Sequence, residues 1–105
     1  MASNAPFGTG LVDHMCVARW SREMWETSNL GPLPPLSLHP VAHVLHYGSA
    51  CFEGLKAHRG VDGVVRICRL DSHVRRMRES ARALVLALPS SELLAEMILA
   101  SHGPA

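Results

Sequence analysis

The sequence has few of the features that mark specialised classes of protein. Its three cysteines form no CxxC pair, and their odd number favours reduced thiols over a disulfide framework. We expect Cys16, Cys51 and Cys68 to be small buried hydrophobic side chains. No apolar run approaches the roughly 18 residues of a membrane-spanning helix, so no membrane segment is predicted.

Targeting signals are also missing from the start of the sequence. Residues 1–10 contain no arginine and no apolar core segment, unlike a signal peptide or a mitochondrial presequence. The expected location is therefore cytoplasmic, with a mitochondrial one as the alternative.

The chain also has few lysines and a small net charge. Lys56 is the only lysine, and the formal net charge is +1 at pH 7. A nearly neutral chain without alternating basic and aromatic residues is a poor nucleic-acid binder, so no nucleic-acid partner is expected.

What the chain does have is enough apolar content for one folded unit. Its 105 residues are 48% hydrophobic, so we expect a single domain over 1–105. Residues 1–10 are expected to be a loose lead-in, and residues 101–105 a tail.

Local patterns predict strands first and helices second. Strands are expected at 12–20, 24–30, 52–59 and 64–68. Asp62-Gly63 between apolar runs predicts a hairpin, and the proline-rich segment 31–35 predicts an exposed connection. A helix capped by Asp71 or Ser72 should run to about residue 86, and a second, capped by Ser90 or Ser91, over 92–100. This order predicts an α+β fold, with antiparallel hairpin strands followed by two helices.

Arg76 stands apart from the other arginines of the first predicted helix. Three of them lie together beside its apolar stripe, which is typical of a solvated basic face: Arg75, Arg78 and Arg82. Arg76 points roughly 100° or more away from these, on the 3.6-residue period of a helix. It is either a surface charge paired with Ser72 or Glu79, or a guanidinium fork for a phosphate or carboxylate.

Three histidines have spacing that suggests a metal site. However, Pro40 disfavours a helix that would include His39 together with His43 and His46, and no acidic ligand lies nearby. No metal site is therefore predicted.

Several motifs occur in a fixed order along the chain. They are Asp13-His14-Met15, Leu38-His39-Pro40, Leu45-His46-Tyr47, Phe52-Glu53-Gly54-Leu55-Lys56-Ala57, Cys68-Arg69-Leu70 and Arg76-Met77-Arg78-Glu79-Ser80-Ala81. Together they resemble the small domain of class IV (fold-type IV) pyridoxal-phosphate transaminases, especially branched-chain amino acid aminotransferases. The resemblance is collinear over about residues 7–98.

The resemblance implies a cofactor, substrates and site residues. The cofactor would be pyridoxal 5'-phosphate, and the substrates an amino acid (valine, leucine or isoleucine) and a 2-oxo acid, 2-oxoglutarate. Arg76 would contact the cofactor phosphate, while Tyr47, Phe52 and Gly54 would shape the pocket for the substrate side chain. The complete enzyme would be a homodimer.

The same resemblance implies that catalysis needs more than these residues. In the family, the lysine that binds the cofactor covalently lies in a second, larger domain, so Lys56 is not implied to be catalytic and no catalytic residue is assigned. The chain would be the N-terminal part of the complete enzyme, an incomplete small domain that is inactive alone. Alternatives are a non-catalytic truncated product or partner domain, or another fold-type IV transaminase or lyase.

Overall fold

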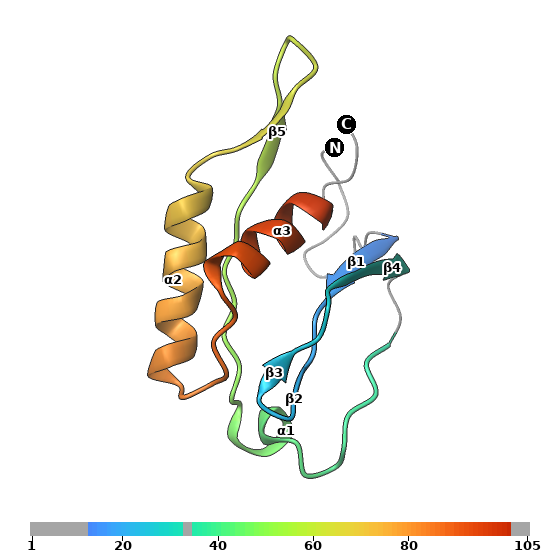
Figure 1. The fold of residues 1–105 in the computed structure, drawn as a ribbon, viewed down its shortest axis with the longest axis vertical. Coiled ribbons are helices and arrows are strands. Elements are labelled where there is room, and N and C mark those ends of the chain that lie inside the picture. Colours follow the sequence, from blue (N-terminus) through green and yellow to red (C-terminus); the bar gives the residue numbers. More distant parts are fainter. Residues whose placement is uncertain (1–12, 33–34, 102–105) are drawn as a thin grey trace.

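The computed structural model describes residues 13–32 and 35–101. The elements, in chain order, are β1 (His14–Val17), β2 (Trp20–Ser21), β3 (Met24–Trp25), β4 (Asn29–Pro32), α1 (His43–Tyr47), β5 (Ala57–Arg59), β6 (Val65–Ile67), α2 (Leu70–Ala83) and α3 (Ser91–Ser101). Antiparallel strand pairs precede the two long helices, which confirms the α+β prediction (Figure 1). The lead-in predicted for 1–10 and residues 102–105 of the predicted tail lie outside the described residues.

The first strands form one long, bent hairpin. β1 pairs with β4, with His14 opposite Pro32, and β2 pairs with β3, with Trp20 opposite Trp25. Arg22 and Glu23 join β2 to β3, and their φ angles of 52° and 63° match the tight turn that suits twisted strands. The strand predicted over 12–20 is therefore interrupted after β1, and the one predicted over 24–30 is divided between β3 and β4.

The predicted connection over 31–35 is wrong at its beginning. Gly31 and Pro32 belong to β4, where they pair with Met15 and His14. Proline is tolerated there because each strand of a two-stranded pair has a free edge that needs no amide donor.

The hairpin predicted at Asp62-Gly63 is confirmed. β5 and β6 are antiparallel, with Ala57 opposite Ile67, and Gly63 has a φ of 81°. The pair projects away from the helices as an arm (Figure 1). The strand predicted over 52–59 begins only at Ala57, because its partner β6 is three residues long.

The two long helices differ in how they begin. α2 starts at Leu70, after Arg69 in a left-handed conformation, and has no side-chain cap, so the predicted cap at Asp71 or Ser72 is wrong. Those two residues already lie inside the helix because the chain turns directly out of β6. α3 does have the predicted cap, since the Ser90 hydroxyl accepts a hydrogen bond of 3.0 Å from the Leu93 amide.

The short helix α1 was not predicted. It has five residues and ends at Gly48, which has a φ of 63°. Glycine is favoured at this position because a side chain is strained in the left-handed region. Gly48 was the available signal, but a single turn of helix has too little periodicity to be recognised from sequence.

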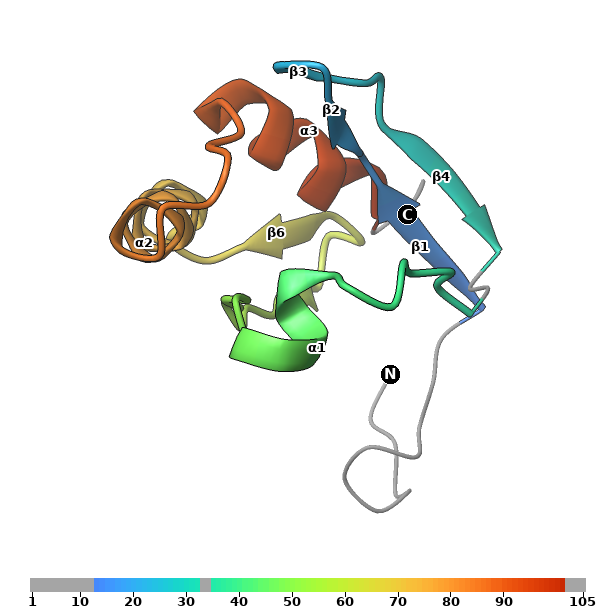
Figure 2. The ribbon, with the colours of Figure 1, turned by 90° about the horizontal axis from the view of Figure 1, so that it is seen from below.

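The helices and the first hairpin form a thin layered body. α3 lies between α2 and the β1–β4 pair and contacts both (Figure 2). Among the described residues only Val74 and Ala81, both on α2, are buried, with exposures of 5% and 4%. Cys68 is exposed, so the prediction of three buried cysteines is wrong for Cys68, and Cys16 and Cys51 are only partly buried.

Two hydrogen bonds hold the loop between α2 and α3. The Trp25 indole N–H donates to the Leu88 carbonyl at 3.1 Å, and the Arg78 Nε donates to the Pro89 carbonyl at 2.9 Å. Arg78 is therefore not simply part of a solvated basic face, as the sequence suggested.

Candidate functional site

The segment from residue 51 to residue 58 has two distinct faces. Residues 51, 53, 55 and 57 are partly buried, whereas residues 52, 54, 56 and 58 are exposed. Such alternation is typical of an extended backbone, in which successive side chains point to opposite sides. Phe52 and Gly54, which the family resemblance placed in one pocket, thus share a face, and the Phe52 ring is 90% exposed.

The inner face of this segment is attached to α2 at three positions. The Cys51 thiol lies 3.9 Å from the Met77 sulfur, and Glu53 contacts both His73 and Arg76. The three helix residues have i, i+3 and i+4 spacing, so they lie on one side of α2. These contacts therefore position the segment along α2 and direct its exposed face away from the helix.

Arg76 has a partner that the sequence did not predict. Its Nη2 lies 3.3 Å from Glu53 Oε1, in place of the expected pairing with Ser72 or Glu79. The Arg76 side chain is 66% exposed, whereas that of Glu53 is 12% exposed. A guanidinium carries five N–H donors, so most of them are left for a ligand.

Tyr47 is placed differently from the other predicted site residues. It is the last residue of α1, is 77% exposed, and its ring lies 5.0 Å from that of His43. The structure thus connects Arg76 to the segment carrying Phe52 and Gly54, whereas the ring contact of Tyr47 is within its own short helix.

Glu53 and His73 are the residues that the sequence analysis overlooked. His73 Nδ1 lies 2.6 Å from Glu53 Oε2. The sequence contained a signal for both residues: Glu53 lies between the predicted pocket residues Phe52 and Gly54, and His73 precedes Arg76 by one helical turn. Residue type alone, however, does not show which charges meet across segments.

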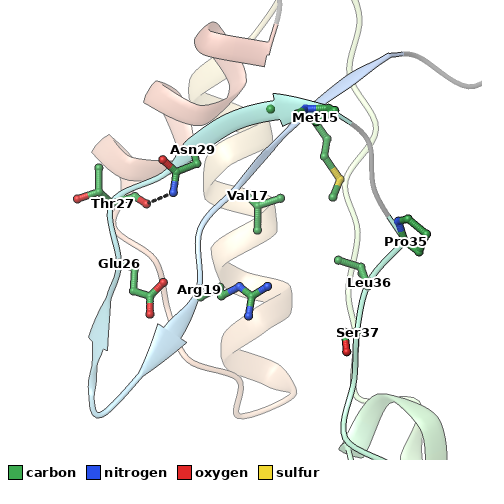
Figure 3. Close-up of a pocket in the computed structure, with 11 residues that line it drawn as sticks. Met15, Val17, Arg19, Glu26, Thr27, Asn29, Pro35, Leu36 and Ser37 are labelled. Carbon is green, nitrogen blue, oxygen red and sulfur yellow. Dashed lines mark hydrogen bonds between the residues drawn. The ribbon is translucent and has the colours of Figure 1, made fainter.

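Two cavities elsewhere in the structure are lined by none of the predicted site residues. One, of about 320 Å³, lies between the β1–β4 hairpin and residues 35–37, where Met15 and Leu36 reach toward each other (Figure 3). The other, of about 450 Å³, lies under Trp25 between α2 and α3 and is mostly apolar. Neither cavity is lined by Tyr47, Phe52, Gly54 or Arg76.

The histidines near α1 make local hydrogen bonds. His39 Nδ1 accepts from the Val41 amide, and His46 Nε2 donates to the Pro40 carbonyl. Within 13–32 and 35–101, no three potential ligands are grouped as a metal ion would require. Nor does this part of the chain contain a helix with the length and apolar character needed to cross a membrane.

Comparisons with known proteins identify relatives over most of the chain. The chain is 47% identical over 94 residues to the cytosolic branched-chain-amino-acid aminotransferase of Ovis aries, a match that covers 88% of this chain. It is 39% identical over 93 residues to the mitochondrial enzyme of that name from Schizosaccharomyces pombe, and 41% over 83 residues to a probable one from Streptomyces coelicolor, covering 88% and 78% of this chain. The chain belongs to the branched-chain-amino-acid aminotransferase family.

The match is nevertheless partial from the relatives' side. The aligned regions amount to 24%, 22% and 23% of these three aminotransferases, so the chain spans about a quarter of their length. No family model matches the chain. Activity, substrates and assembly of the whole aminotransferase are therefore matters for proposal.

Proposed function

We propose that this chain is the part of a pyridoxal-phosphate-dependent branched-chain aminotransferase that holds the cofactor phosphate and shapes the substrate side-chain pocket. The complete enzyme would exchange an amino group between valine, leucine or isoleucine and 2-oxoglutarate, as a homodimer in the cytoplasm. The observation that carries the proposal is the similarity to aminotransferases of this name, at 36–47% identity over most of the chain.

The proposed phosphate contact is Arg76. Pyridoxal 5'-phosphate, when bound, supplies the electron sink for transamination. Arg76 fits one contact to its phosphate because the guanidinium is mostly exposed, is held at one nitrogen by Glu53, and retains other donors. A planar fork of this kind suits bidentate recognition of a phosphate.

The proposed substrate wall comprises Tyr47, Phe52 and Gly54. Phe52 and Gly54 lie on the exposed face of their segment, and apart from its two chain neighbours no residue has a heavy atom within 4 Å of where a side chain at Gly54 would begin. The face is thus open beside the phenyl ring. Covering an aliphatic substrate side chain there would contribute about 1.5–3 kcal/mol.

The phosphate assignment is tested by Arg76→Gln in the protein that carries this chain. We expect the affinity for pyridoxal 5'-phosphate to fall about tenfold or more, because a charge-assisted hydrogen bond contributes about 1.5–3 kcal/mol. Equilibrium dialysis measures the affinity, and the matched control is Arg75→Gln, which removes an exposed arginine one position away. An equal loss in both variants would show that only net charge matters and would contradict the assignment.

A second candidate is a non-catalytic product or partner domain. The position of Lys56, the single lysine of these 105 residues, favours it, because this lysine lies on the exposed face of residues 52–58. Adding pyridoxal 5'-phosphate to the 105-residue chain tests this candidate. A visible absorbance band that is lost in Lys56→Ala would show covalent capture by this lysine and would count against a purely non-catalytic role.

A further inference from the structure

Glu53 occupies an unusual position for a carboxylate. Its side chain is only 12% exposed, and its two oxygens have different partners: His73 Nδ1 at 2.6 Å and Arg76 Nη2 at 3.3 Å. Glu53 and His73 also line a cavity of about 160 Å³ whose other walls are apolar, among them Leu55 and Met77. Low polarity on this side strengthens the contact between Glu53 and His73 compared with the same contact in open water.

The donors and acceptors in this cluster fix its arrangement. An ionised carboxylate can only accept hydrogen bonds, so His73 Nδ1 must carry the proton that points at Glu53. Arg76 Nη2 forms an ion pair with the other oxygen, at 3.3 Å. Glu53 is therefore held against one side of α2 by two residues spaced one turn apart, while its own backbone is fixed by the inward-facing neighbours Cys51 and Leu55.

This arrangement has a consequence for Arg76. An exposed arginine is free to adopt many rotamers, and a ligand that binds it must restrict them. A partner that is itself partly buried and held in place restricts the arginine rotamers before the ligand binds. We propose that Glu53, locked by His73, is a positioning residue that presents the Arg76 guanidinium to an incoming phosphate; the inference rests on the proposed function of Arg76.

Two physical effects of Glu53 have opposite signs, which makes the inference testable. As a negative charge near the bound phosphate, Glu53 would weaken phosphate binding, so its neutralisation would strengthen binding. As a positioning residue it would strengthen binding, so its neutralisation would weaken it. Immobilising one long side chain corresponds to about a two- to tenfold change in affinity.

The decisive variant is Glu53→Gln, studied in the 105-residue chain. The glutamine oxygen can still accept from His73, but its amide then directs N–H groups toward Arg76, so the arginine is released selectively. The matched control is Glu79→Gln, which removes the same charge from an exposed position on α2, three residues after Arg76. The probe is 4'-deoxypyridoxine 5'-phosphate, which has the phosphate but no aldehyde and cannot react with Lys56.

Two measurements are made on each variant. The first, without any ligand, is nitrogen-15 relaxation of the Arg76 Nε–H group, with the signal assigned by Arg76→Gln. We expect this group to be ordered in the original chain and in Glu79→Gln, and mobile in Glu53→Gln. The second is the affinity for the probe, expected to fall about two- to tenfold in Glu53→Gln and to stay equal or rise slightly in Glu79→Gln.

The outcomes separate the inference from the proposed function. Equal mobility of Arg76 in the original chain and in Glu53→Gln, or tighter binding of the probe by Glu53→Gln, would overturn the positioning role. If Arg76→Gln binds the probe as well as the original chain does, the phosphate role of Arg76 fails and the positioning role with it. The relaxation data would then still decide whether Glu53 orders the side chain.

Discussion

The β5–β6 arm and the region around Trp25 are stabilised in different ways. In the arm, Asp62 accepts from the Val64 amide and pairs with Arg66, so both of these side-chain contacts join residues no more than four positions apart. Around Trp25, the bond to the Leu88 carbonyl joins residues 63 positions apart. The side-chain contacts of the arm are therefore local in sequence, whereas the helical region depends on a contact between residues far apart in the chain.

The largest effect is expected at Trp25. Trp25→Ala would remove the hydrogen bond to Leu88 and one wall of the apolar cavity between α2 and α3, which we expect to lower the free energy of unfolding by about 3 kcal/mol. Urea denaturation followed by circular dichroism measures the change. Trp20→Ala is the control, because Trp20 packs on Trp25 with ring centroids 5.4 Å apart but is 45% exposed. Similar losses in the two variants would contradict a special role for the long-range contact.

The same valine-to-alanine substitution can be made in each region and the two effects compared. Val74 on α2 is 5% exposed, whereas Val61, between β5 and β6, is fully exposed. We expect Val74→Ala to lower the free energy of unfolding by about 2 kcal/mol, through lost burial of two methyl groups, and Val61→Ala by less than about 0.5 kcal/mol. The same denaturation experiment measures both changes. A larger loss of stability in Val61→Ala than in Val74→Ala would mean that Val61 is buried in solution, and would contradict the comparison.

The smallest effect is a pH dependence confined to the arm. The side chain of Arg66, followed by the Val64 amide, lowers the pKa of Asp62 from its ordinary value of 3.8. Because the folded-state pKa is the lower one, the stabilisation is complete above pH 3.8 and is lost as the pH falls through the folded-state pKa. Full exposure and screening by salt keep the effect small.

Nuclear magnetic resonance can follow this acid effect residue by residue. On acidification, amide shifts of β5 and β6 should change in the original chain and much less in Asp62→Asn, while the indole signal of Trp25 should be the same in both. An equal response of the Trp25 indole and the arm would show that the two regions are coupled.

The contrast also explains what could be predicted from the sequence. The Asp62-Gly63 hairpin and the Ser90 cap were predicted correctly because each depends on a few neighbouring residues. The start of α2 was wrong because it is set by Arg69, whose left-handed backbone no cap pattern signals. The strand predicted over 52–59 was wrong in its first half because a strand needs a partner, and alternation of exposed and buried residues does not supply one.

The candidate site was predictable to a similar degree. The order of motifs along the chain was sufficient for the family, since several matches in sequence are far more specific than one. Arg76 was singled out by its angle on the helix, but its partner Glu53 was not, because pairing between segments depends on how closely they pack. The assignments of Tyr47, Phe52, Gly54 and Arg76 stay predictions.

The two-faced segment over 51–58 constrains how such a protein can diverge. Residues 52, 54 and 56 are exposed, so replacements there alter the surface that an outside molecule meets and leave the contacts with α2 in place. A single residue inserted between Cys51 and Phe52 would instead exchange the two faces, moving the carboxylate to the outside and the phenyl ring toward α2. In this stretch the number of residues therefore constrains the packing more than the identity of every second residue does.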